Sequence, residues 1–132
     1  MGVSLVDIAV WKWLYEHPGA TPAQLKETVI CTATEVWNTY YADAIGIKDS
    51  PILAIYSHMI DNPMYISNYP VGHLIDFQLD GYLKGKNFAS EVLRIYSQGD
   101  LIPQYWMKLA VGTGISIRPL LEATEKALTV VK

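Results

Sequence analysis

The residues of this sequence that are best suited to chemistry lie in one stretch, from His58 to Gly72. It contains a histidine, two tyrosines (Tyr65 and Tyr69) and two prolines, just ahead of an amphipathic helical pattern. Each proline disfavours the helical conformation in the residue before it, so we expect an ordered turn. Neutral Tyr and His side chains donate hydrogen bonds well to an oxygen that gains negative charge. The stretch indicates a binding or catalytic site; the alternative is aromatic packing with one hydrogen bond each.

The composition indicates a surface that is partly covered by other polypeptide. The 132 residues are enough for one domain or for a piece of a larger one. Hydrophobic residues make up 51% of the chain and charged residues only 17%, against about 25% charged in an average soluble domain. We infer that another subunit, or polypeptide beyond this chain, covers part of the surface. The alternative is an unusually apolar monomer.

Charge and cysteine content exclude several classes of function. The net charge is −3 and no basic run is present, so nucleic-acid binding through phosphate neutralisation is not expected. Cys31 is the only cysteine, which excludes an intrachain disulfide, and we expect it to be a small buried hydrophobic residue of a helix. No apolar run approaches ~18 residues, so no membrane span is expected. The N-terminus lacks the pattern of a secretory signal, and a cytoplasmic location is expected.

Helical periodicity predicts an all-α fold, a compact array of about six or seven helices. Ser4 is expected to cap the first helix, and Thr21 and Gln24 to form a capping box at the start of the second. No segment shows sustained alternation of apolar and polar residues, so no strand is predicted. The helices are expected at about 4–15, 22–44, 52–57, 71–84, 88–98, 103–109 and 117–131, within one helical segment over residues 1–132.

Other catalytic and metal chemistry finds little support. There is no Gly-x-Ser-x-Gly sequence and no glycine-rich phosphate loop. His73, Asp76 and Asp80 share one face of a predicted helix and could in principle bind a metal ion. That face is also the polar, solvent-facing side of the helix. We therefore expect no metal ligands in this chain.

The stretch from His58 to Gly72 resembles the C-terminal part of the oligoendopeptidase F and thimet oligopeptidase family of zinc metallopeptidases. In that family a His is followed by Pro at five, Tyr at seven and eleven, and Gly at fourteen residues. The same offsets here give His58, Pro63, Tyr65, Tyr69 and Gly72. The resemblance covers most of the chain, with flanking stretches at Tyr15-Glu16-His17-Pro18, Tyr40-Tyr41, Tyr96-Ser97-Gln98-Gly99-Asp100 and Ala110-Val111-Gly112.

The resemblance implies peptide-bond hydrolysis in a deep channel. In the family, a His-Glu-x-x-His helix and a later helix hold zinc, and C-terminal Tyr and His residues contact the substrate. By this matching His58, Tyr65, Tyr69 and Gly72 would bind a peptide substrate. Either Tyr65 or Tyr69 would stabilise the oxyanion, and the spacing does not choose between them.

The sequence departs from the family in one decisive respect, because it contains no His-Glu-x-x-His. The resemblance then implies the C-terminal, substrate-side part of a peptidase catalytic domain, inactive alone, whose partner is an N-terminal zinc-bearing part of the same protein. The chain itself would hold no cofactor. The alternative is a non-catalytic, all-helical interaction or scaffold module. In either case we expect the isolated chain to self-associate, through Trp11, Trp13 and Leu14 of an uncovered first helix.

Overall fold

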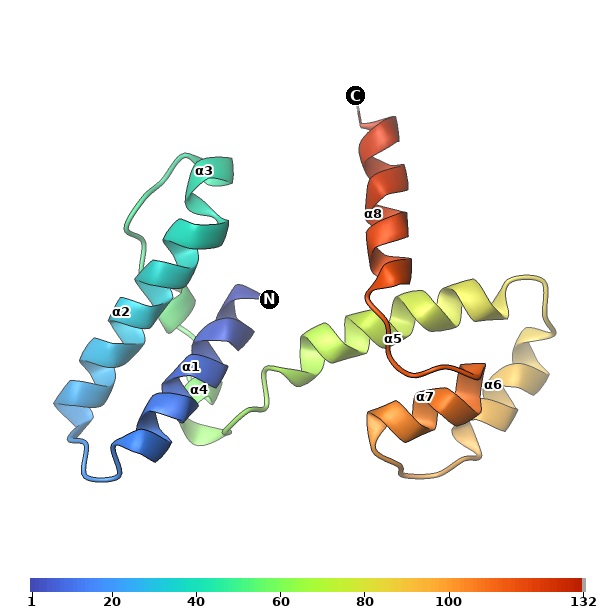
Figure 1. Ribbon diagram of the computed structural model, residues 1–132, viewed down its shortest axis with the longest axis horizontal. Helices are drawn as coiled ribbons and strands as arrows, with labels where there is room; N and C mark the ends of the chain where they lie inside the picture. Colours follow the sequence, from blue (N-terminus) through green and yellow to red (C-terminus); the bar gives the residue numbers. More distant parts are fainter. Residues whose placement is uncertain (132) are drawn as a thin grey trace. The chain divides into compact units, whose positions relative to one another are not determined.

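A computed structural model describes residues 1–131, and these residues form helices and no strands. The predicted all-α fold is confirmed. Two single-turn helices, α3 and α4, add to the about six or seven helices expected from the sequence. The elements in chain order are α1 (Gly2–Glu16), α2 (Pro22–Tyr40), α3 (Ala42–Ile45), the 3-10 helix η1 (Ile52–Ala54), α4 (His58–Asp61), α5 (Asn68–Leu83), α6 (Phe88–Tyr96), α7 (Pro103–Val111) and α8 (Arg118–Val130) (Figure 1).

The chain divides into two compact units, Met1–Pro70 and the part from Val71 onward, and the division falls in the first turn of α5. Each unit is described by itself. The single helical segment expected over residues 1–132 stays a prediction. None of the helices described is both long enough and apolar enough to cross a membrane.

The first unit is built on α1 and α2, which lie side by side and run in opposite directions (Figure 1). Both η1 and α4 pack against α1. Residues four apart lie on one face of a helix, so each helix contributes such a pair to the core. The core consists of Val6 and Val10 of α1, Val29 and Ala33 of α2, Met59 of α4, and Ile66.

The start of α2 follows the sequence prediction. The backbone N–H of Gln24 donates to Thr21 Oγ1 at 3.4 Å, and the backbone N–H of Thr21 donates to Gln24 Oε1 at 2.9 Å. Pro22 occupies the first turn, where no intrahelical donor is needed. This capping box fixes the turn between α1 and α2.

The prediction that Ser4 caps the first helix is wrong. The helix α1 begins at Gly2, and Ser4 lies inside it with its side chain buried. The Ser4 hydroxyl donates instead to the backbone carbonyl of Ile66 at 3.1 Å. The Ser4 hydroxyl, which the local pattern assigned to a helix cap, therefore bonds to a residue 62 positions away in sequence.

The prediction that Cys31 is buried is also wrong, because Cys31 is exposed on α2. The buried residues of this helix are Val29, Ala33 and Trp37, and a residue two positions from such a stripe points away from it. The Glu35 carboxylate, whose Oε1 lies 3.7 Å from Cys31 Sγ, raises the pKa of the thiol. The thiol is therefore protonated and weakly nucleophilic at neutral pH.

In the second unit, Arg94 of α6 ties that helix to the end of α7. Its guanidinium donates to the backbone carbonyls of Leu109 at 3.2 Å and Ala110 at 2.7 Å. These are among the carbonyls that a helix end leaves without an intrahelical partner. Arg94 also lies 2.8 Å from Glu91 Oε2, and this hydrogen bond holds the pKa of Glu91 below its ordinary value.

Replacing Arg94 by Lys is expected to lower the free energy of unfolding, because an ammonium group cannot reach both carbonyls and the carboxylate. Urea unfolding followed by circular dichroism measures the change. Arg118→Lys, at the exposed start of α8, is the matched control. Equal losses in the two variants would contradict this role for Arg94.

Candidate functional site

The structure brings together three of the four residues that the sequence singled out. His58 begins α4, Tyr65 lies in the turn that follows, and Tyr69 lies in the first turn of α5. The ring centroids of His58 and Tyr65 are 5.6 Å apart. Those of Tyr65 and Tyr69 are 5.7 Å apart, with the ring planes at 88°. The edge-to-face arrangement is a favourable one for aromatic pairs.

The two tyrosine hydroxyls form a hydrogen-bonded pair, with 3.2 Å between their oxygens. Each phenol carries one hydrogen, so one hydroxyl donates within the pair and the other keeps its hydrogen for an external acceptor. A hydroxyl that accepts one hydrogen bond becomes a better donor of another. The hydrogen bond to Tyr65 raises the pKa of Tyr69 above its ordinary value. The Tyr69 hydroxyl therefore stays protonated at neutral pH.

The ring cluster is open to solvent. Tyr65 is 43% exposed and Tyr69 is 50% exposed, while His58 is half-buried. Tyr69 lines an open hollow together with Tyr56, Ile66 and residues at the start of α1. The phenol groups can therefore be reached by a bound molecule.

Tyr56 belongs to the same cluster, and sequence reasoning missed it. Its ring centroid lies 4.8 Å from that of His58, with the planes tilted by 40°. The sequence signal was present, since Tyr56 stands only two residues before His58. Tyr56 adds a third phenol to the ring cluster, and together with Tyr69 it lines the hollow.

The imidazole of His58 has two weak polar contacts, both at Nδ1. Ser57 Oγ lies 3.5 Å and Asp61 Oδ1 lies 3.9 Å from this atom. Within residues 1–131 no hydrogen bond involves Nε2, which is therefore the ring nitrogen available to a ligand. An exposed carboxylate at this distance adds little to the energy of the site.

Gly72 lies in α5, within the part of the chain from Val71 onward. Its backbone does not adopt the left-handed conformation that favours glycine, and a Cβ added there would meet no heavy atom within 4 Å. No steric reason for glycine exists at this position. The role of Gly72 in substrate binding stays a prediction.

The segment that carries the cluster is held on α1 by its backbone. Trp11 Nε1 donates to the carbonyl of Met59 at 2.7 Å, and the Ser4 hydroxyl donates to that of Ile66. Met59 and Ile66 themselves point into the core. Met64, between them, has φ +61°, a conformation that costs a residue with a Cβ about 1 kcal/mol. The fold of the first unit thus maintains a turn that the isolated segment would not favour.

Within the described residues, no group of three or more His, Cys, Asp or Glu side chains is arranged to hold a metal ion. The three residues considered from the sequence have surface contacts instead. His73 lies 3.9 Å from Asp76, and Asp80 lies 2.8 Å from Lys84, all of them exposed. In the part of the chain that the structure describes, these three side chains are therefore not gathered around one metal position.

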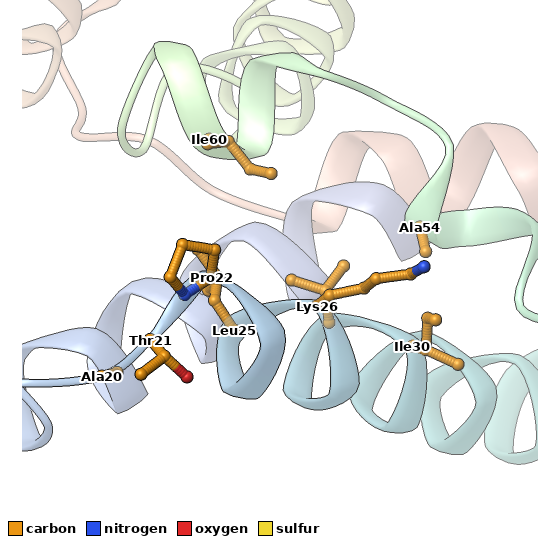
Figure 2. Close-up of a pocket in the computed structure, with 9 residues that line it drawn as sticks. Ala20, Thr21, Pro22, Leu25, Lys26, Ile30, Ala54 and Ile60 are labelled. Carbon is orange, nitrogen blue, oxygen red and sulfur yellow. The ribbon is translucent and has the colours of Figure 1, made fainter.

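A second hollow, of about 570 Å³, lies between the first half of α2 and the segments around η1 and α4 (Figure 2). Its walls are mostly apolar, and Lys26 supplies the one charged group. Such a surface suits an apolar side chain and offers no group for catalysis. The lining residues are Ala20, Thr21, Pro22, Leu25, Lys26, Val29, Ile30, Ala54 and Ile60.

Comparisons of this chain with protein-family models, with curated proteins and with solved structures found no match.

Proposed function

We propose that this chain is the C-terminal, substrate-side part of a zinc-dependent oligopeptidase that hydrolyses peptide bonds. The resemblance of the stretch from His58 to Gly72 suggests the reaction. The observation that supports it in the structure is the hydrogen-bonded pair of Tyr65 and Tyr69 beside the ring of His58, accessible from solvent.

The chemistry proposed for these residues follows from the hydrogen-bond donors that they carry. When a peptide carbonyl is attacked, its oxygen gains negative charge and needs hydrogen-bond donors already in place. The tyrosine pair offers one free O–H for this purpose, and either phenol can present it. His58 would contact the peptide through Nε2. One such donor in a site shielded from water contributes about 3 kcal/mol to the transition state.

The zinc ion would be held by an N-terminal part of the same protein. A zinc ion in a peptidase polarises the carbonyl and lowers the pKa of a bound water. In this proposal the chain itself holds no zinc, so it would bind substrate without hydrolysing it. The hydrophobic fraction of 51% is consistent with a face that such a part covers.

The test of this function starts with the reading frame that precedes Met1. We expect it to encode a His-Glu-x-x-His helix, and we expect the polypeptide that carries both parts to cleave a quenched fluorescent peptide. Zinc chelation should abolish the cleavage, and the 132-residue chain alone should show none. A stop codon directly upstream, or cleavage by the chain alone, would contradict the proposal.

A non-catalytic interaction module is the second candidate, and one observation favours it. Five isoleucines at 45, 47, 52, 55 and 60 each expose more than half of their surface, up to 83% at Ile55. Exposed apolar side chains are typical of interaction sites where they form one contiguous patch. The stop codon described above would favour this module over the peptidase.

The three residues of α1 that were expected to promote self-association have contacts within the first unit. Trp11, Trp13 and Leu14 are each half-buried. Trp11 bonds to Met59, Trp13 stacks on His17 at 4.4 Å between ring centroids, and Leu14 packs on the core. These side chains of α1 are thus less exposed within the first unit than the apolar sequence pattern of the helix indicated.

We still expect the isolated chain to self-associate, through the exposed isoleucines. Light scattering should give a mass above that of a 14.8 kDa monomer at high concentration. Replacing Ile52 and Ile55 by Ser should shift the equilibrium towards monomer, since both side chains are exposed and their loss removes apolar surface. The control Thr39→Ser changes an exposed polar residue. A monomeric wild-type chain at high concentration would contradict this expectation.

A further inference from the structure

The ring cluster offers aromatic faces as well as hydroxyl groups. The side chains of Tyr56, Tyr65 and Tyr69 are all exposed. Tyr65 and Tyr69 meet edge to face, so the ring that presents its edge keeps both of its own faces clear of the other ring. The face of an aromatic ring carries negative potential and attracts a cation. The proposed reaction uses the hydroxyl groups and leaves these faces without a role.

Two of the three rings line one open hollow of about 220 Å³ at the start of α1. This volume is several times the ~30 Å³ that one water molecule occupies in the liquid, so a compact head group fits. Among the side chains of the lining, Ser4 carries the one polar group besides the phenols, and its hydroxyl already donates to Ile66. A bound group would therefore meet ring faces and hydrocarbon, with few hydrogen-bond acceptors. The lining residues are Met1, Val3, Ser4, Tyr56, Ile66 and Tyr69.

The segments that line the hollow contain no basic side chain. Residues 1–11 and 49–70, which include every lining residue, contain no lysine and no arginine. They do contain Asp61, whose Oδ1 lies 3.9 Å from Nδ1 of His58 in the ring cluster. The amino group of Met1 is a cation where the chain begins at this residue, and an amide where polypeptide precedes it. The charges of the side chains thus favour a cationic ligand over an anionic one.

We propose that this hollow binds a methylated ammonium group, whose charge rests against the ring faces of Tyr56 and Tyr69. A quaternary ammonium group donates no hydrogen bond, so it loses little where acceptors are few, whereas the ammonium group of lysine is strongly hydrated. The inference does not rest on the proposed function, because it uses the faces of the rings and the oxyanion site uses their hydroxyl groups.

Choline and 3,3-dimethylbutan-1-ol test the role of the charge, since the two molecules share one shape and differ in charge. The N-terminally acetylated chain, which lacks the cationic amino group, is titrated with each by nuclear magnetic resonance at pH ~8, where an ordinary imidazole is neutral. Choline is expected to bind at least about 5-fold more tightly than the alcohol and to shift the ring protons of Tyr56 and Tyr69. Equal affinities, or rings that choline does not shift, would overturn the proposal.

Variants of the tyrosines separate the ring faces from the hydroxyl groups. Tyr69→Leu removes one face and should weaken choline binding at least about 5-fold, whereas Tyr69→Phe keeps the face and should stay within about 3-fold of the wild type. Tyr40→Leu, at the exposed end of α2, is the matched control and should bind choline as the wild type does. Undiminished binding in Tyr69→Leu would count against the site, and Tyr56→Leu gives the same test if Tyr69→Leu does not fold.

The same variants keep this proposal apart from the proposed function. Tyr65 and Tyr69 both changed to phenylalanine should retain choline binding, although this double variant lacks the hydroxyl groups that the oxyanion site needs. Loss of choline binding in a folded double variant would contradict a site made of ring faces. The measurement uses no substrate and no zinc, so it is independent of any peptidase assay.

A methylated ammonium group can belong to a small molecule or to a methylated lysine of a peptide, and two peptides distinguish these sources. A peptide with one trimethyllysine is expected to bind at least about 5-fold more tightly than the same peptide with unmodified lysine. Binding of the methylated peptide that exceeds that of choline assigns the site to a peptide, and the reverse order assigns it to a small molecule. Equal binding of the two peptides would overturn the preference for a methylated group.

Discussion

Replacing both Tyr65 and Tyr69 by phenylalanine is expected to lower the kcat of the proposed zinc-bearing polypeptide by about 100-fold to 1,000-fold, the usual effect of losing an oxyanion donor. The two hydroxyls lie 3.2 Å apart and share one internal hydrogen bond. A single Tyr→Phe change leaves the other hydroxyl free to donate, so each single variant should lose less than the double variant. The effects of the two single changes on the free energy of activation should therefore not add up to the effect of the double change, as expected for groups in one hydrogen-bond network.

Steady-state kinetics with a quenched fluorescent peptide measures this effect. Tyr40→Phe is the matched control, because Tyr40 is exposed at the end of α2, outside the ring cluster, and should keep wild-type turnover. Unchanged kcat in the double variant would remove both tyrosines from catalysis. A higher KM with unchanged kcat would assign them to substrate binding alone.

Replacing Met59 by alanine is expected to lower the free energy of unfolding of the first unit by about 2–4 kcal/mol. Met59 is 1% exposed and is one of the largest fully buried side chains. It anchors α4, a helix of only four residues, which cannot persist without tertiary contacts. Its loss should therefore loosen the segment that carries His58 as well as reduce stability.

Urea unfolding measures the change, and Met64→Ala provides the matched control. Met64→Ala removes the same side-chain atoms from a methionine that is 40% exposed. Truncation there should lower the free energy of unfolding by less than about 1 kcal/mol. The ring contacts between His58 and Tyr65 should weaken in Met59→Ala and persist in the control. Equal destabilisation of the two variants would contradict the role of Met59 as an anchor.

Local signals were enough to predict the helical fold and the start of α2. The Thr21–Gln24 capping box uses partners three residues apart, and the core pairs Val6–Val10 and Val29–Ala33 follow helical spacing. Ser4 was misjudged because its partner, Ile66, is distant in sequence. Cys31 was misjudged because it was assigned to the core by its residue type, although it stands two positions from both Val29 and Ala33.

The cluster of rings could be predicted only in part. The spacing of His58, Tyr65 and Tyr69 drew attention to them, but their proximity depends on the turn at Met64 and on α1 beneath it. No local pattern predicts a positive φ at a methionine, which tertiary contacts must maintain.

The most direct test of the central claim is a crystal structure of the zinc-bearing polypeptide with a phosphinic peptide, which mimics the tetrahedral intermediate. We expect a phosphinyl oxygen within about 3 Å of the hydroxyl of Tyr65 or Tyr69. His58 Nε2 should lie at hydrogen-bond distance from the peptide. A bound phosphinate whose oxygens touch neither tyrosine, with His58 facing away from the peptide, would contradict the account.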